Sequence, residues 1–181
     1  MPKAPGLPFW KNGTPAFTKN FRTNQPVRSS NQHCSFVFVK RKAGIALGSN
    51  LGDRYGHIEA AIAALQGIHE GPESDFRVAT IIETEPVDCE PGTPGFLNTV
   101  LELDTSLEPL ELFDVCQKIE EEAGRPGKRA KNSPRTIDVD LLYLGALEMD
   151  TDRLILPHPR MHERDFVMEP LREIGAEFPR A

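Results

Sequence analysis

The hydrophobic and polar positions of this chain alternate with two periods, one typical of strands and one typical of helices. Residues 36–39 and 43–47 are apolar runs of strand length, and a Gly-containing turn follows at 48–53. After this turn, apolar residues return every three or four positions, which predicts a helix that begins near Asp53 and ends at Gly67. The apolar stripe of this helix consists of Ile58, Ile62, Leu65 and Ile68.

Two further strands and a second helix are predicted next. Residues 76–84 and 96–104 are rich in β-branched and other apolar residues, and a Pro- and Gly-rich loop separates them. Pro109 opens the second helix, because a missing N–H costs nothing in the first turn. Gly124 supplies a left-handed cap at the other end. The buried stripe that we expect on this helix consists of Leu112, Cys116, Ile119 and Ala123.

The last long strand is predicted at residues 136–144, which gives the order β-α-β-β-α-β. This order is the split βαβ pattern of ferredoxin-like folds. A short strand at 154–156 and a helix through Phe166, Leu171 and Ile174 follow it. The expected fold class is therefore α/β (an α+β sandwich), with a ferredoxin-like core, an additional C-terminal strand and a short helix.

Residues 1–35 show neither period. They are rich in Pro, Asn, Ser, Thr and Lys, and we interpret them as a disordered basic extension without a catalytic function. The rest of the 181 residues, 36–181, is enough for one domain with a sizeable core. We expect this domain to be a monomer.

The distribution of charge and of cysteine narrows the functional classes. The whole chain carries −6, and the eight basic and no acidic side chains of residues 1–42 leave −14 for the remainder. A body of this charge repels nucleic acid. No apolar run has the length of a membrane span. Three cysteines without a CxxC pair are typical of reduced thiols, so we expect a cytoplasmic protein that binds neither nucleic acid nor membrane.

Two acidic residues stand at the start of the last long strand. Side chains two positions apart in a strand share a face, so Asp138 and Asp140 are expected side by side, with Leu142 and Leu144. The opposite face is expected to carry Ile137, Val139, Leu141 and Tyr143. Buried carboxylates require positive partners. One interpretation is a structural ion pair with Arg135, and the other is a Mg²⁺ site, since Mg²⁺ prefers one or two carboxylates together with phosphate oxygens.

The segment before these acids is basic. Five cations fall within eleven residues, and glycine and proline make the segment suitable as a lid over a triphosphate. Guanidinium groups bind phosphate oxygens in bidentate fashion, so arginines are better candidates than lysines. The five cations are Arg125, Lys128, Arg129, Lys131 and Arg135.

Six motifs in the same order and at the same spacing give the chain a specific resemblance. From about Ala43 to Phe178 it resembles the 6-hydroxymethyl-7,8-dihydropterin pyrophosphokinases. The motifs are Gly48-Ser-Asn-Leu-Gly-Asp53, Thr84-Glu-Pro-Val87, Phe96-Leu-Asn98, Glu120 with Gly124-Arg125, Pro134-Arg-Thr-Ile-Asp-Val-Asp140, and Pro157-His-Pro159 with Arg164-Asp-Phe166.

The resemblance implies a ferredoxin-like fold and transfer of diphosphate from ATP to the hydroxymethyl group of a dihydropterin, with release of AMP. It implies two Mg²⁺ ions on Asp138 and Asp140, with Arg125 and Arg135 acting on the polyphosphate. The implied nucleotide site consists of Gln117, Glu120, Arg125, Lys128, Arg135, His158 and Arg164. The implied pterin site consists of Thr84, Val87, Phe96, Asn98 and Phe166.

Two other functional classes compete with this interpretation. A Mg²⁺-dependent nucleotidyltransferase of similar topology also uses paired aspartates, but it releases pyrophosphate instead of AMP. A ferredoxin-like RNA-binding module needs a basic, aromatic-studded sheet, and the acidic body argues against one.

Overall fold

A computed structural model of the chain describes residues 39–85, 94–124 and 135–180. Within these ranges, no helix combines the length and the apolar character that a membrane crossing requires. The strands are β1 (Arg41–Ser49), β2 (Arg77–Val78), β3 (Ile82–Thr84), β4 (Phe96–Thr105), β5 (Asp138–Leu144), β6 (Met149–Asp150) and β7 (Ile155–Leu156). The helices are α1 (Arg54–Gln66), α2 (Pro109–Glu122) and α3 (Asp165–Glu173), with short 3-10 segments η2 (Glu73–Asp75) and η3 (Met161–Glu163).

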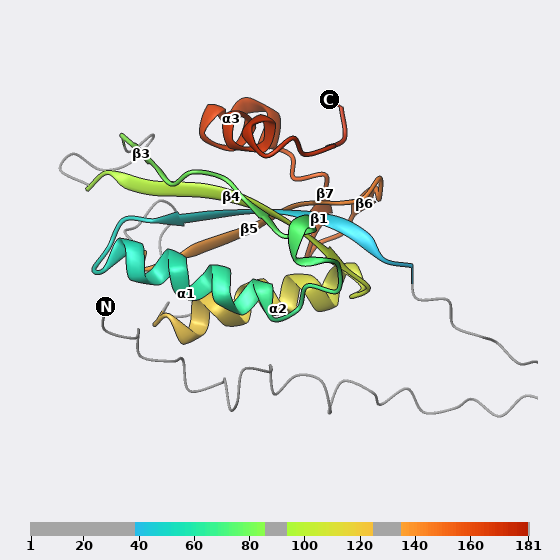
Figure 1. The fold of residues 1–181 in the computed structure, drawn as a ribbon, viewed down its shortest axis with the longest axis horizontal. Helices are drawn as coiled ribbons and strands as arrows, with labels where there is room; N and C mark the ends of the chain where they lie inside the picture. The colour runs from blue at the N-terminus through green and yellow to red at the C-terminus, as the bar shows by residue number, and fades with distance from the viewer. Residues whose placement is uncertain (1–38, 86–93, 125–134, 181) are drawn as a thin grey trace, which may run out of the picture.

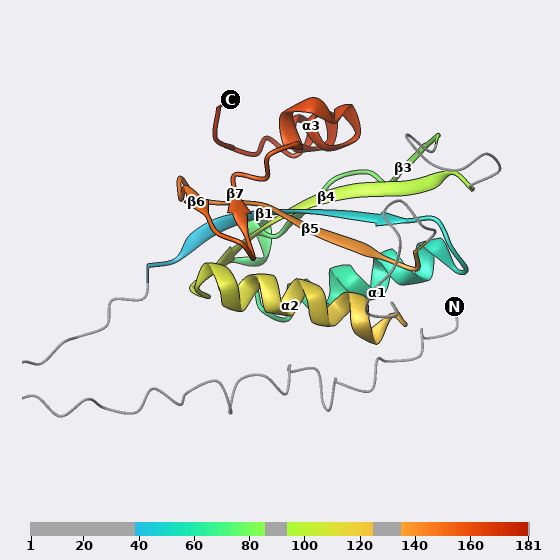
Figure 2. The same ribbon diagram turned by 180° about the vertical axis from the view of Figure 1, so that it is seen from behind.

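A mixed helix and sheet architecture follows from these elements. The main sheet is antiparallel and runs β2-β4-β1-β5, with β3 also paired to β4, while β6 and β7 form a separate pair. Helices α1 and α2 cover one face of the sheet, and α3 lies on the opposite face (Figure 1). The view from behind shows the same three layers (Figure 2).

Local sequence signals set the ends of both long helices. Asp53 is the N-cap of α1, where its carboxylate accepts the Gly56 N–H at 3.0 Å. Pro109 occupies the first turn of α2, as predicted, after a capping box formed by Glu108 and Glu111. Gly124 has a φ of +83°, which confirms the predicted left-handed cap.

The apolar side chains form two clusters, one on each face of the sheet. The larger cluster joins the sheet to α1 and α2, and it includes Ile58, Leu65, Leu112, Cys116 and Ile119 of the predicted helical stripes. The smaller cluster lies under α3. It consists of Val100, Leu142, Tyr143, Met161, Val167, Met168 and Leu171.

The prediction of one strand over residues 76–84 is wrong, because β2 and β3 are two short strands with a break between them. Both strands pair with β4. At the break, the backbone N–H of Thr80 donates to the carboxylate of Glu173 at 3.0 Å instead of to a neighbouring strand. The register with β4 also shifts by one residue across the break, from Val78 opposite Leu101 to Ile82 opposite Asn98, and this irregularity divides the strand in two.

The predicted faces of β5 are correct at its start and wrong at its end. Ile137, Val139 and Leu141 belong to the cluster under α1 and α2, but Tyr143 belongs to the cluster under α3 and Leu144 lies with α1 and α2. The register between β1 and β5 shifts between Gly44, opposite Tyr143, and Ile45, opposite Leu141. One extra residue in a strand exchanges the two faces for every residue after it.

The ends of the predicted domain also differ in detail. Strand β1 contains the strand expected at 43–47 and extends beyond it at both ends. Val39 precedes β1 and is exposed, and the rest of the strand expected at 36–39 lies outside the described ranges. The C-terminal strand, β7, pairs with β6 and does not join the main sheet. The final helix ends at Glu173, with Ile174 as its C-cap.

Candidate active site

Small residues on the middle strand leave room above the sheet. Gly44, Ala46 and Gly48 alternate along β1, and the backbone register places Gly48 between Asn98 of β4 and Asp138 of β5. In the same way, Ala46 lies between Val100 and Asp140. A cavity of about 430 Å³ opens over Ala46 and Gly48, on the face of the sheet that α3 covers.

The two predicted acids line this cavity together. Asp138 and Asp140 are both among its lining residues, which agrees with the shared face predicted from their spacing. Each carboxylate already has a cationic partner. Arg135 lies 2.8 Å from an oxygen of Asp138, and Arg164 lies 3.1 Å from an oxygen of Asp140. The predicted ion pair with Arg135 is therefore present, and the two guanidinium groups share the cavity wall with the acids.

Burial and a neighbouring charge shift the titration of this site. Burial raises the pKa of Asp140, and the charge of Asp138 raises the same pKa further. His158 and Arg164 act in the opposite direction. Burial lowers the pKa of His158. The backbone N–H of Arg160 donates to Nδ1 of His158 at 3.2 Å, so the neutral imidazole ring carries its proton on Nε2.

The turn after β1 fixes the position of Arg135. The backbone N–H of Arg135 donates to the side-chain oxygen of Asn50 at 2.9 Å, and the backbone N–H of Asn50 donates to the Arg135 carbonyl at 3.3 Å. The Ser49 hydroxyl donates to the Thr136 carbonyl at 2.5 Å. The motif that begins at Gly48 thus holds the backbone just before β5, and with it the guanidinium of Arg135 beside Asp138.

The other part of the cavity has aromatic and amide groups. The Asn98 amide donates to the Thr84 hydroxyl at 2.7 Å, and Asn98 is almost fully buried. Phe96 and Phe166 line the same cavity. The guanidinium of Arg164 lies 5.7 Å from the centre of the Phe166 ring, within range of a cation–π contact. Flat aromatic rings and a buried amide suit a flat heterocycle that has hydrogen-bonding edges.

Eight predicted site residues meet in this one cavity, and the three other predicted residues that the structure describes are not among its lining residues. The eight are Thr84, Phe96, Asn98, Arg135, Asp138, Asp140, Arg164 and Phe166. Gln117 is exposed on α2, and the Glu120 carboxylate accepts the Val139 N–H at 2.9 Å. His158 is near enough to act on Asp140, but it is not among the described lining residues. Val87, Arg125 and Lys128 lie outside the described ranges.

Several lining residues were not predicted. Ala46 and Gly48 had a readable signal, because small residues at alternate strand positions leave one face of a sheet uncovered. Arg160, Glu163 and Asp165 also line the cavity, close to the predicted Arg164. Their only sequence signal is a cluster of charges at 160–165, which is common on exposed surfaces.

The arrangement combines two kinds of binding surface. Two carboxylates and two guanidinium groups at one part of the wall can hold a cation together with a polyanion. The described residues contain no group of three or more His, Cys, Asp or Glu side chains with metal-site geometry. Mg²⁺ usually binds through one or two carboxylates together with water and the phosphates of a substrate.

Comparisons with known proteins agree with this chemistry. The family model described as 7,8-dihydro-6-hydroxymethylpterin-pyrophosphokinase (HPPK) matches residues 44–176. The 2-amino-4-hydroxy-6-hydroxymethyldihydropteridine pyrophosphokinase of Bacillus subtilis is 44% identical over 132 residues, which are 73% of this chain and 77% of that protein. A Pseudomonas aeruginosa protein of the same name is 37% identical over 134 residues, 74% of this chain and 80% of its own length. The folate synthesis bifunctional protein of Arabidopsis thaliana is 39% identical over 132 residues, but these are 26% of its length.

Proposed function

The chain belongs to the 7,8-dihydro-6-hydroxymethylpterin-pyrophosphokinase family, and we propose that its diphosphate transfer takes place in the cavity under α3. The substrates are ATP and 6-hydroxymethyl-7,8-dihydropterin, and the products are AMP and the pterin diphosphate. One observation carries the proposal: a pair of acids with arginine partners and a pair of phenylalanines with a buried amide line the same cavity of about 430 Å³.

The reaction exchanges one bond to phosphorus for another. The pterin hydroxymethyl oxygen attacks the β-phosphorus and loses its proton, and the bond from the β-phosphorus to the oxygen that bridges to the α-phosphorus breaks. AMP leaves with the electron pair of that bond. Transfers of this kind depend mainly on positioning and on neutralisation of charge. The residues that supply both are therefore the ones to identify.

Asp138 and Asp140 are the residues that would hold Mg²⁺, and two ions is our proposal for the number. Their two carboxylates on one strand face, each in contact with solvent at the cavity wall, fit a metal that prefers carboxylate and phosphate oxygens. When bound, Mg²⁺ would supply positive charge to the β- and γ-phosphates. The acids must give up their arginine contacts, at least in part, to serve as ligands.

Arg135 and Arg164 are then available to the polyphosphate. Both guanidinium groups lie within 3.1 Å of an acid in the cavity, so a small movement exchanges a carboxylate oxygen for a phosphate oxygen. We propose Arg125 as a further contact with the phosphates that acts in the chemical step, and Lys128 as a nucleotide contact. Gln117, Glu120 and His158 complete the proposed nucleotide site. The Glu120 carboxylate also accepts the Val139 N–H, which connects it to the start of β5.

The pterin ring would lie between Phe96 and Phe166, with its polar edge toward Asn98 and Thr84. The Asn98–Thr84 hydrogen bond orients the amide, so the oxygen and the second N–H of Asn98 are directed without further ordering. Val87 is proposed as a wall of the same pocket. Offset stacking would hold the flat ring between the two phenylalanines.

The strand order supports a finer description of the fold. We infer a ferredoxin-like core, because β5-β1-β4-β2 is the order that two split βαβ units produce, with both long helices on one face. The monomeric state and the cytoplasmic location stay predictions, as do the domain boundaries at 35 and 36.

Identification of the nucleotide product tests the proposed function. The chain is incubated with Mg-ATP and hydroxymethyldihydropterin, and the nucleotides are separated by chromatography. We expect AMP in an amount equal to the phosphorylated pterin. Pyrophosphate released from ATP, with an adenylated product, would instead indicate a nucleotidyltransferase. The Asp138→Asn variant serves as the control for a contaminating enzyme, since it should form neither product.

A further inference from the structure

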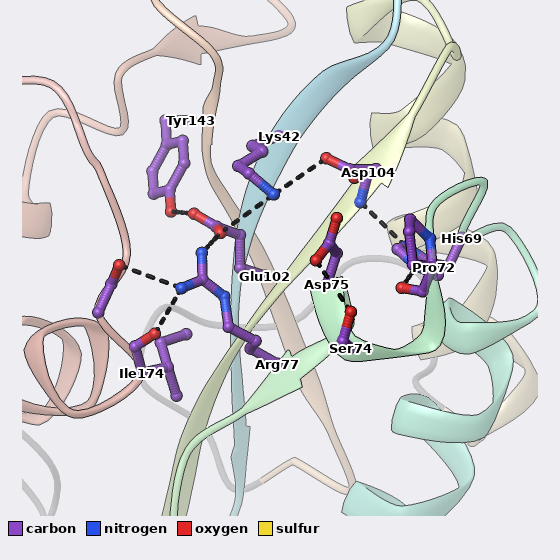
Figure 3. A network of polar contacts seen from close by, with 11 residues as sticks. Lys42, His69, Pro72, Ser74, Asp75, Arg77, Glu102, Asp104, Tyr143 and Ile174 are labelled. Atoms are coloured by element: carbon purple, nitrogen blue, oxygen red, sulfur yellow. Dashed lines mark hydrogen bonds and ion pairs between the residues drawn. The ribbon is translucent and has the colours of Figure 1, made fainter.

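A fully buried glutamate forms the centre of a polar network outside the cavity (Figure 3). Glu102 lies on β4, and its two carboxylate oxygens have different partners. One oxygen accepts the Tyr143 hydroxyl at 2.7 Å, and the other pairs with the guanidinium of Arg77 and, at 3.9 Å, with the ammonium of Lys42. A buried carboxylate without such partners would be costly, so each of these contacts is needed where it is.

Arg77 connects this network to the end of α3. One of its guanidinium nitrogens donates to the carbonyls of Ile174 at 2.8 Å and of Gly175 at 3.2 Å. These carbonyls follow the last turn of the helix, where backbone acceptors lack partners and the helix dipole is negative. Arg77 therefore supplies the hydrogen-bond donor for the free carbonyls at the C-terminal end of α3, and Glu102 supplies the negative charge that keeps the guanidinium in place.

A second contact joins the same two elements. The carboxylate of Glu173, the last residue of α3, accepts both the N–H of Thr80 at 3.0 Å and its hydroxyl at 2.7 Å. Residues 77–80 thus hold the C-terminal end of α3 through Arg77 and through Thr80. Between the two ends of the helix, the contacts with the sheet are apolar and do not fix the helix along its own axis.

The other end of α3 lies at the cavity. Arg164 is the N-cap residue of this helix, Phe166 is its second residue, and both line the cavity. The polar contact that joins this end to the sheet is the ion pair of Arg164 with Asp140. When Asp140 and Arg164 turn to a metal and to phosphate, that contact is lost, and the C-terminal contacts are then what keep the helix in position.

We propose that Arg77 and Glu102 are positioning residues, which hold α3 from its far end so that Arg164 and Phe166 stay over the cavity while substrates bind. The proposal rests on the proposed function of Arg164 and Phe166. A helix of nine residues is about 14 Å long and stiff, so a displacement at one end reaches the other. A misplacement of about 1 Å at a reacting group can lower a rate about 100-fold.

A double-mutant cycle separates positioning from general stability. Arg77→Met removes the guanidinium and keeps the apolar stem, and Arg164→Ala removes the group that we expect it to position. If Arg77 acts through α3, Arg77→Met lowers kcat/KM about tenfold in the wild-type background and by a smaller factor in the Arg164→Ala background, where only Phe166 remains to be positioned. Equal losses in both backgrounds would overturn the proposal, because a merely structural role is additive.

Arg153 offers the matched control. It forms an exposed ion pair with Asp114 at 2.6 Å, and neither residue lines the cavity, so Arg153→Met removes a guanidinium without touching α3. We expect its kcat/KM to equal that of the wild type. If Arg77→Met does not fold, Tyr143→Phe replaces it in the cycle, because it removes only the hydroxyl that donates to Glu102 and should show a smaller coupling of about threefold.

Hydrogen exchange gives a readout that does not require turnover. The amides of Val167 and Met168 both donate to the Arg164 carbonyl at 3.0 Å and so report on the first turn of α3. We expect them to exchange about tenfold faster in Arg77→Met, while amides of α2 are unchanged. Unchanged exchange in the first turn of α3 would overturn the proposal for Arg77 and Glu102. A lack of diphosphate transfer by the wild-type chain would instead refute the proposed function alone, so the two failures can be told apart.

Discussion

The packing of Tyr143 against Gly44 predicts a large loss of stability from a single added methyl group. A β-carbon built on Gly44 lies 2.2 Å from Cε1 of Tyr143 and 2.5 Å from its Cζ, whereas ordinary contacts begin at 3.4 Å. The ring must therefore move by more than 1 Å in the Gly44→Ala variant. The ring is fully buried, and its hydroxyl donates a hydrogen bond to the equally buried Glu102, so there is no open space into which the ring can move.

The magnitude follows from the two contacts that change. Overpacking a core costs about 1–3 kcal/mol. Weakening a hydrogen bond to a buried charge costs about 1.5–3 kcal/mol, and the reduced backbone freedom of alanine returns about 0.5–1 kcal/mol. We expect a net loss of about 3 kcal/mol in the free energy of unfolding, a large part of the roughly 5–15 kcal/mol typical of a domain.

Urea unfolding followed by circular dichroism measures this loss. With an m-value of about 2 kcal/mol/M, the midpoint should fall by about 1.5 M at unchanged m. The control is Tyr143→Leu, which removes the ring, because Gly44→Ala should then cost little when added to it. A midpoint of Gly44→Ala close to that of the wild type would refute the packing argument, and so would an equal cost in both backgrounds.

Three further predictions concern the cavity and the core. Gly48→Ala places a methyl group 2.9 Å from the Asn98 oxygen and should raise the KM for the pterin about tenfold; an unchanged KM in steady-state assays would show that the pterin binds elsewhere. Asp140→Asn keeps the shape of the side chain and removes its charge, so kcat/KM should fall at least about 1000-fold with an unchanged circular dichroism spectrum. Normal turnover of this variant at ordinary Mg²⁺ concentration would exclude a metal-binding role for Asp140. Burial raises the pKa of the Cys116 thiol, so mass spectrometry should find this residue unalkylated by iodoacetamide in the folded protein and alkylated in urea; rapid labelling of the folded protein would contradict its burial.

Signals within one element predicted most of what is local in this structure. Pro109 and Gly124 set the ends of α2, because one fits the first turn of a helix and the other adopts a left-handed conformation. The alternation of a strand placed Asp138 and Asp140 on one face. Each of these features depends only on residues that are close together in the sequence, so the sequence alone is enough to predict it.

Features that depend on distant contacts could not be predicted in this way. The break between β2 and β3 coincides with a register shift against β4 and with the contact of Thr80 to Glu173, 93 residues further along the chain. The exchange of faces in β5 accompanies a register shift where Tyr143 lies opposite Gly44. The burial of Glu102 could not be predicted for the same reason, because a glutamate in a strand is usually exposed and its partners here, Arg77, Lys42 and Tyr143, are distant in the sequence.

In the proposed active site, Asp138 and Asp140 exchange their arginine partners for metal when ATP binds. A crystal structure with Mn²⁺ in place of Mg²⁺ and a non-hydrolysable ATP analogue tests it most directly, since anomalous scattering locates the metal. We expect metal between the two carboxylates and the phosphates, with Arg135 and Arg164 turned toward phosphate oxygens. Carboxylates still paired with Arg135 and Arg164, with the metal and the phosphates bound elsewhere, would contradict it.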